Sequence, residues 1–224
     1  MATYKLNIGT IRGCPAPGEL LQAIQGFGLP ETEEYGVLNC SATDGAVFAT
    51  IVRKTQQAVP KLDADTQEVT AAPVERVTVY PLAVRPAQER LEIYAGAASS
   101  VEQAGVFFSS CLALPTVVEP IEVDIPAAVE KLAKTTQRFQ LRAIRVREYA
   151  HNAYMAGTYA PKFLDTEHGT DFLAEYAESV AGASVRFQGP TGRVTVGLSG
   201  QAAFSFSCAE EDLAAVRAIL RKLV

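Results

Sequence analysis

The sequence predicts an α+β protein made of two halves, each an antiparallel sheet with helices packed on it. The clearest strands lie between residues 183 and 207, where apolar residues alternate with polar or small ones over three segments separated by short glycine-containing turns. Other segments place apolar residues at helical spacing, as Leu20, Ile24 and Phe27 do. With 224 residues, 48% hydrophobic and 20% charged, the chain has the composition of a globular protein with a packed core.

The first half is predicted to alternate strands with helices. Residues 55–73 show no periodicity and few β-branched clusters, so we expect a long loop there. The elements expected in order are a strand at 3–12, a helix at 17–27, two strands around the Asp44-Gly45 turn, the loop at 55–73, two strands joined near 86–88, and a helix ending near Leu112.

The second half contains the most regular patterns. An acidic, proline-containing segment and a short helix precede it, so we divide the chain into an N-terminal α+β half at 1–114, a linker with a short helix at 115–137, and a C-terminal α+β half at 138–224. The elements expected in this half are a strand at 138–150, a helix near 171–181, three strands between 183 and 207, and a final helix.

Both halves run strand, helix, antiparallel strands, helix, over about 3–112 and 155–224. This order resembles the repeat unit of the TATA-binding-protein-like fold. The resemblance implies a pseudo-duplicated arrangement, in which helices cover one face of a curved antiparallel sheet and leave the other face free for a partner. The intercalating phenylalanine pairs of the TATA-binding protein have no matching positions here, so the resemblance assigns no site.

One segment, "RFQLRAIRVREYAHN" at 138–152, has four arginines within ten residues. As a regular strand it would place Phe139 and Leu141 on one face and Ile144 and Val146 on the other. A bulge at Ala143-Ile144 adds one residue and restores the alternation, so that all four apolar side chains face inward and the arginines face outward. A helix would leave no single apolar stripe, so the bulged strand is the better interpretation.

The outward arginines predict a basic face on the C-terminal sheet. Its small residues Thr195, Gly197, Ser199, Ala203 and Ser205 make it flat, and Lys131 and Lys134 extend it along the sequence. Guanidinium groups match carboxylate and phosphate oxygens, so such a face can bind an acidic surface or a phosphate backbone. The predicted binding residues are Arg138, Arg142, Arg145, Arg147, Arg186 and Arg193.

The alternative is an ordinary solvated strand face. Its arginines would then pair with the acidic segment that contains Glu119, Glu122, Asp124 and Glu130. Tyrosines beside the arginines, at 149, 154 and 159, could stack nucleic-acid bases, although tyrosines at such positions are more often ordinary packing residues.

No catalytic or metal-binding motif stands out. The cysteines Cys14, Cys40, Cys111 and Cys208 are scattered, and no phosphate-binding loop or zinc motif is present. The two histidines are His151 and His168; the second lies among acidic residues but lacks ligand spacing, and a helix cap is the simpler explanation. The prediction is therefore no cofactor, no metal and no catalytic residue.

The charge and composition point to a cytoplasmic protein without a membrane segment. A net charge of −5 and a pI near 5.2 repel nucleic acid overall, so any anion-binding site has to be local. We expect a non-catalytic binding or assembly module that docks a protein partner, or a subunit of a homo-oligomer, through the basic face. The alternatives are nucleic-acid binding by the same face and a small enzyme with a site near His151 or His168.

Overall fold

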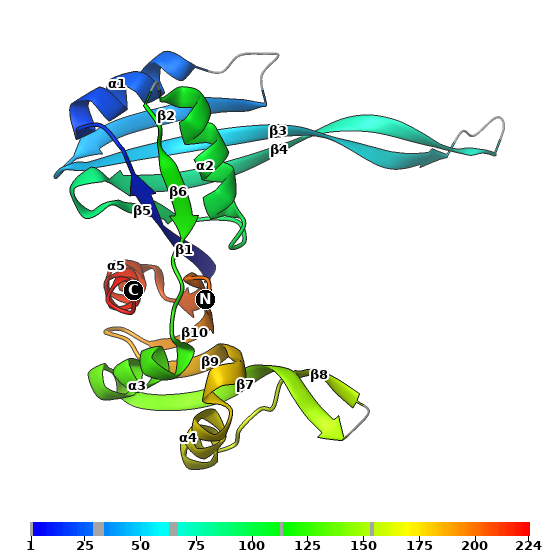
Figure 1. Cartoon of the computed structure of the whole chain (residues 1–224), viewed down its shortest axis with the longest axis vertical. Coiled ribbons are helices and arrows are strands. Elements are labelled where there is room, and N and C mark those ends of the chain that lie inside the picture. The colour runs from blue at the N-terminus through cyan, green and yellow to red at the C-terminus, as the bar shows by residue number, and fades with distance from the viewer. Residues whose placement is uncertain (1, 29–33, 63–66, 113, 153–154) are drawn as a thin grey trace. The chain divides into compact units, whose positions relative to one another are not determined.

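The computed structural model describes residues 2–28, 34–62, 67–112, 114–152 and 155–224 (Figure 1). Every strand pair with an assigned register is antiparallel, which confirms the predicted α+β class. The α-helices are α1 (Pro17–Phe27), α2 (Ser100–Cys111), α3 (Ile125–Thr135), α4 (Thr166–Glu175) and α5 (Leu213–Arg221). The strands are β1 (Ala2–Arg12), β2 (Tyr35–Thr43), β3 (Ala46–Leu62), β4 (Val69–Arg85), β5 (Arg90–Ile93), β6 (Val117–Pro120), β7 (Gln137–Asn152), β8 (Met155–Tyr159), β9 (Val180–Gln188), β10 (Arg193–Ser199) and β11 (Ala203–Cys208).

The chain forms two compact units that alternate along the sequence. Unit 1 comprises Met1–Thr10, Glu92–Glu102 and Glu119–Val224, and unit 2 comprises Ile11–Leu91 and Gln103–Val118. The elements β1, β5, α2 and β6 each have residues in both units. The contiguous division at 114 and 137 stays a prediction about domains. Among the described residues, no helix combines the length and the apolar character needed to cross a membrane.

Unit 2 contains a long two-stranded ribbon, and the prediction of a loop at 55–73 is therefore wrong. β3 and β4 pair without a register shift from Val47–Val84 to Leu62–Val69, and only residues 63–66 of that loop lie outside the described residues. The outer part of the ribbon is exposed on both faces, including Val74. Because neither face packs on a core, these strands need no alternation of apolar and polar residues, and the sequence therefore does not show them as strands. The ribbon extends well beyond α1 and α2 (Figure 1).

The base of unit 2 has its own aromatic core. Phe107 of α2 packs edge-on against Phe27 of α1, with ring centroids 5.3 Å apart, and contacts Tyr35 of β2. The Tyr35 hydroxyl donates a hydrogen bond to Gln103 Oε1 at 3.0 Å. These contacts hold both helices against the sheet, because large aromatic side chains bury much apolar area at each contact.

Unit 1 carries the candidate site. Its strands pair in the order β1, β11, β10, β9, β7, β8. In β10 and β11 every second side chain is buried, as the sequence predicts, and these side chains form one core with α3, α4 and α5. Helix α3 contributes Val129 and Leu132 to this core, and α5 contributes Val216 and Leu220. One face of the sheet is therefore covered by helices, and the opposite face of β7, β9, β10 and β11 is open.

A buried ion pair links the middle segment of unit 1 to its C-terminal helix. Glu92 of β5 is 0% exposed, and its oxygens accept hydrogen bonds from Arg221 Nε at 2.8 Å and Arg221 Nη2 at 2.7 Å. The Tyr94 hydroxyl also donates to Glu92 Oε2, at 2.9 Å. Burial and the neighbouring Glu92 raise the pKa of Tyr94 to about 12, so this hydroxyl remains a donor at neutral pH.

We predict that Arg221→Ala destabilises unit 1 by about 3 kcal/mol, because it leaves a buried carboxylate without its cation. Urea unfolding should show this as a lower midpoint. Lys222→Ala, a neighbouring exposed cation, is the matched control and should change stability by less than about 0.5 kcal/mol. Equal midpoints for Arg221→Ala and the wild-type protein would contradict this role for the ion pair.

Candidate functional site

Strand β7 contains a bulge, as the sequence predicts, but the extra residue lies just before the predicted Ala143-Ile144 position. Leu141 pairs with Val185 of β9, but Ala143 pairs with the next residue, Ser184, so Arg142 is the extra residue. Leu141, Ile144 and Val146 are buried in the core of unit 1, and Phe139 packs against it. The predicted inward set is confirmed.

The other edge of β7 also holds the bulge in place. Phe163 donates its backbone N–H to the Arg142 carbonyl at 2.9 Å, and Ile144 donates to the Pro161 carbonyl at 3.3 Å. Two further register shifts occur, one between Gln137 and Gln140 and one after Arg145, which the sequence does not predict. The irregular strand therefore turns its arginines outward at several points.

We call the open side of β7, β9, β10 and β11 the arginine face. Arg186 of β9 lies opposite Gln140 of β7 and Thr195 of β10, and Arg193 lies opposite Gln188. In this register Arg193 is a diagonal neighbour of Arg186, at roughly 7–8 Å between Cα atoms. Arg142 follows Gln140, the residue opposite Arg186, by two positions and lies in the bulge. The structure thus groups Arg142, Arg186 and Arg193.

The remaining predicted arginines lie further along β7. Arg145 lies opposite Gly182, and its Nη2 donates to the Ala181 carbonyl at 3.4 Å. Arg138 is exposed at the start of the strand with a positive φ of 52°, and Arg147 is exposed beyond the last register shift. These two lie toward opposite ends of the strand and do not join the central group.

The arginine face has very little negative charge. Strands β9, β10 and β11 contain no acidic residue, and β7 contains only Glu148. None of the six arginines forms an ion pair with any described residue. The Nε atom of Arg186 is covered by neighbouring atoms and has no hydrogen-bond partner in the described part of the chain.

Two carboxylates of the acidic segment that could have neutralised these arginines have other partners. Asp124 caps α3, where its Oδ1 accepts a hydrogen bond from the backbone of Ala127 at 3.0 Å. Glu130 pairs with Lys134 one helical turn away. The alternative of a solvated strand face paired with this segment therefore lacks its ion pairs among the described residues.

The expected extension of the basic face to Lys131 and Lys134 is wrong. Both lysines belong to α3, which packs on the covered side of the sheet. Lys131 donates to the backbone carbonyl of Lys222, and Lys134 pairs with Glu130. Nearness in sequence is misleading here, because the chain changes layer between α3 and β7.

The tyrosines beside the arginine run lie in an aromatic cluster and not on the arginine face. Tyr149 packs against Tyr159 in a tilted arrangement with ring centroids 4.6 Å apart, and against Tyr176, the C-cap residue of α4, at 5.4 Å. Phe172 of α4 packs against Tyr159 and Tyr176. Tyr154 lies outside the described residues. Packing in this cluster beside α4 explains why Tyr149 and Tyr159 occur here, and no base-stacking role is needed to explain them.

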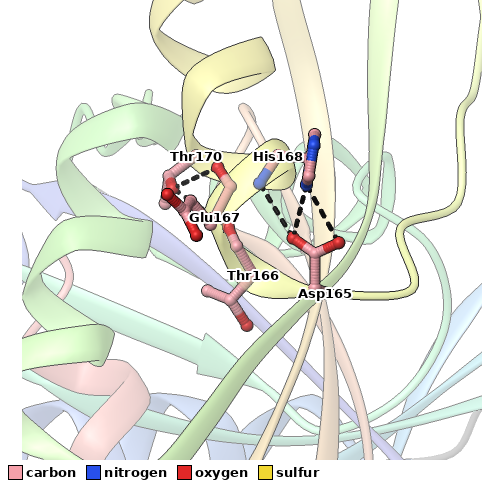
Figure 2. Close-up of polar contacts among 5 residues, drawn as sticks. All are labelled: Asp165, Thr166, Glu167, His168 and Thr170. Carbon is pink, nitrogen blue, oxygen red and sulfur yellow. Dashed lines mark hydrogen bonds and ion pairs between the residues drawn. The ribbon is translucent and has the colours of Figure 1, made fainter.

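His168 belongs to a helix cap (Figure 2). Asp165 precedes α4; its Oδ1 accepts the backbone N–H of His168 at 3.0 Å and lies 2.9 Å from the ring Nδ1. The hydrogen bonds from His168 lower the pKa of Asp165, and the hydrogen bond to Asp165 raises the pKa of His168. The side chain of His151 lies outside the described residues. Among the described residues, no group of three or more His, Cys, Asp or Glu side chains lies close enough together to hold a metal ion.

The cysteines are poor nucleophiles in this fold. Cys14, Cys40, Cys111 and Cys208 are free thiols. Burial raises the pKa of Cys14 and of Cys111 to about 11, so very little thiolate exists at neutral pH. The described histidine and cysteines therefore do not form an activated pair.

No family model and no curated protein matches the chain.

We predict that Asp165→Asn lowers the pKa of His168, measured by NMR titration of its ring protons, because the carboxylate favours the protonated ring. The cap contact with protonated His168 is complete below the ordinary pKa of 6.5 and is lost as pH rises through the raised folded-state pKa. Glu167→Gln is the matched control, since Glu167 is a lesser cause of the shift, and should change this pKa less. An unchanged pKa in Asp165→Asn would contradict the cap assignment.

Proposed function

We propose that the protein is a non-catalytic binding or assembly module that uses its arginine face to dock an acidic protein surface, on a separate partner or on another subunit. The observation that carries this proposal is the set of six arginines that form no ion pair with any described residue, on strands β7, β9 and β10, whose only acidic residue is Glu148. Carboxylates on a partner would supply the missing charge-assisted hydrogen bonds.

The arrangement of charge supports an electrostatic docking surface. The whole chain carries a net charge of −5, so the arginine face is a local exception to the overall sign. A patch of this kind steers an oppositely charged partner and fixes its orientation. Helices on one sheet face with the other face free is also the arrangement that the TATA-binding-protein-like resemblance implies; the resemblance itself remains a proposal.

Nucleic-acid binding is less well supported by the same face. The aromatic residues of β7, β9 and β11 that lie near it, Phe139, Phe187, Phe204 and Phe206, all point into the core. The face therefore offers no described aromatic ring for base stacking, which single-stranded nucleic-acid sites commonly use. The lack of a described stacking ring therefore favours a protein partner.

We predict that Arg142→Glu combined with Arg145→Glu abolishes the native complex, because four units of charge change on the docking face. Light scattering of the purified protein and co-purification from the native source, at about 50 and about 200 mM salt, would measure it. Wild-type assembly should also weaken at the higher salt concentration. An assembly that survives both the double reversal and the higher salt would contradict the proposed function.

The matched control is Lys134→Glu combined with Lys222→Glu, which makes the same charge change on the helix-covered side of unit 1. This control should assemble like the wild-type protein. Gel-shift assays with single- and double-stranded DNA and RNA test the nucleic-acid alternative. A salt-sensitive shift lost only in the arginine variant would replace the protein partner by a nucleic acid.

A further inference from the structure

The arginine face contains a hollow of about 310 Å³, formed entirely within unit 1. Its floor follows one row of cross-strand neighbours: Ala143 of β7, Ser184 of β9, Gly197 of β10 and Ser205 of β11. A second row adds Gly182 and Ser199. Small side chains on four adjacent strands thus produce a groove that runs across the strands.

Two cations lie toward the ends of this groove. Arg145 lines it at the β7 end, and Lys5 of β1, which is not part of the lining, lies opposite Ser205 one strand beyond the other end. From β7 to β1 there are four strand spacings, or about 19 Å, which is the length of about six residues of extended chain. The groove has the dimensions of a short peptide segment and positive charge at both ends.

The groove also offers free donors. Arg145 uses one of its N–H groups for the Ala181 carbonyl, and that contact holds its guanidinium over Gly182. The hydroxyls of Ser184, Ser199 and Ser205 have no hydrogen-bond partner among the described residues. A fixed guanidinium above a floor of hydroxyl donors suits a carboxylate and the polar backbone of a peptide.

We propose that this groove binds an extended acidic segment of a protein partner, lying across the strands with carboxylates on Arg145 and Lys5. The inference rests on the proposed function and specifies the occupant of the same face. A peptide is favoured over nucleic acid because the groove presents hydroxyls and small side chains and has no aromatic ring in its lining.

The groove can be closed without changing its charge. Ser184→Phe places a large ring on the central row, between Ala143 and Gly197. Thr135→Phe is the matched control, because Thr135 is an exposed residue of α3, on the helix-covered side of unit 1, and does not line the groove. Circular dichroism and thermal unfolding of both variants establish that the fold is retained.

Fluorescence anisotropy with a labelled peptide of alternating glutamate and alanine measures the binding, and the same peptide with glutamine measures the charge requirement. We expect Ser184→Phe to weaken glutamate-peptide binding at least about tenfold and Thr135→Phe to change it less than about threefold. Arg145→Gln and Lys5→Gln should each weaken binding, and the glutamine peptide should bind far less than the glutamate peptide.

The outcomes separate this inference from the proposed function. If Ser184→Phe binds the peptide as the wild type does, or if the wild type does not bind it, the groove proposal is overturned. The arginine face is still the docking surface in that case, provided that the Arg142→Glu, Arg145→Glu variant loses its native complex. Tighter binding of a short single-stranded DNA than of the peptide would also overturn the groove proposal.

Discussion

The arrangement of unit 1 depends on one constraint on β7, which has to bury four apolar side chains while it keeps every arginine in solvent. A regular strand cannot do this, because side chains alternate with period two and Leu141 and Ile144 are three residues apart. The extra residue Arg142 resolves the conflict, and backbone hydrogen bonds to β9 on one edge and to residues 161–163 on the other hold it. Without the bulge, part of the apolar set and part of the charged set would exchange faces.

A second constraint acts on the neighbouring strands β9 and β10, where close contacts leave little room for a Cβ atom at two glycines. A Cβ on Gly182 would lie 2.7 Å from the Leu198 carbonyl oxygen, and one on Gly197 would lie 2.7 Å from Ser205 Oγ. The first contact is with backbone and cannot yield by a rotamer change, so Gly182 is required by the fold itself. The groove on the arginine face is partly a consequence of close strand packing.

Local patterns predicted much of the fold and of the face. The alternation of apolar and polar residues predicted β10 and β11, and the spacing of Phe139, Leu141, Ile144 and Val146 predicted a bulge in β7. In both cases the side chains on one face of the strand have to be apolar because they pack in the core. The same logic failed for β3 and β4, whose outer residues face solvent on both sides. The Glu92–Arg221 pair joins residues 129 apart in sequence. Helix α3 directly precedes β7 but lies in a different layer. No pattern of neighbouring residues predicts either feature. Of the candidate site, the arginines were predictable, and the groove between them was not.

The small residues and the arginines of the candidate site have different explanations. This difference indicates which of the two sets serves a function. Close packing accounts for Gly182, and small residues on an open face need no ligand to be stable. Packing does not account for six arginines that have no ion-pair partner among the described residues, since solvated strands tolerate neutral polar residues equally well and like charges on adjacent strands repel. An acidic partner converts that repulsion into charge-assisted hydrogen bonds. The arginines, more than the shape of the face, are therefore the feature that a binding function explains.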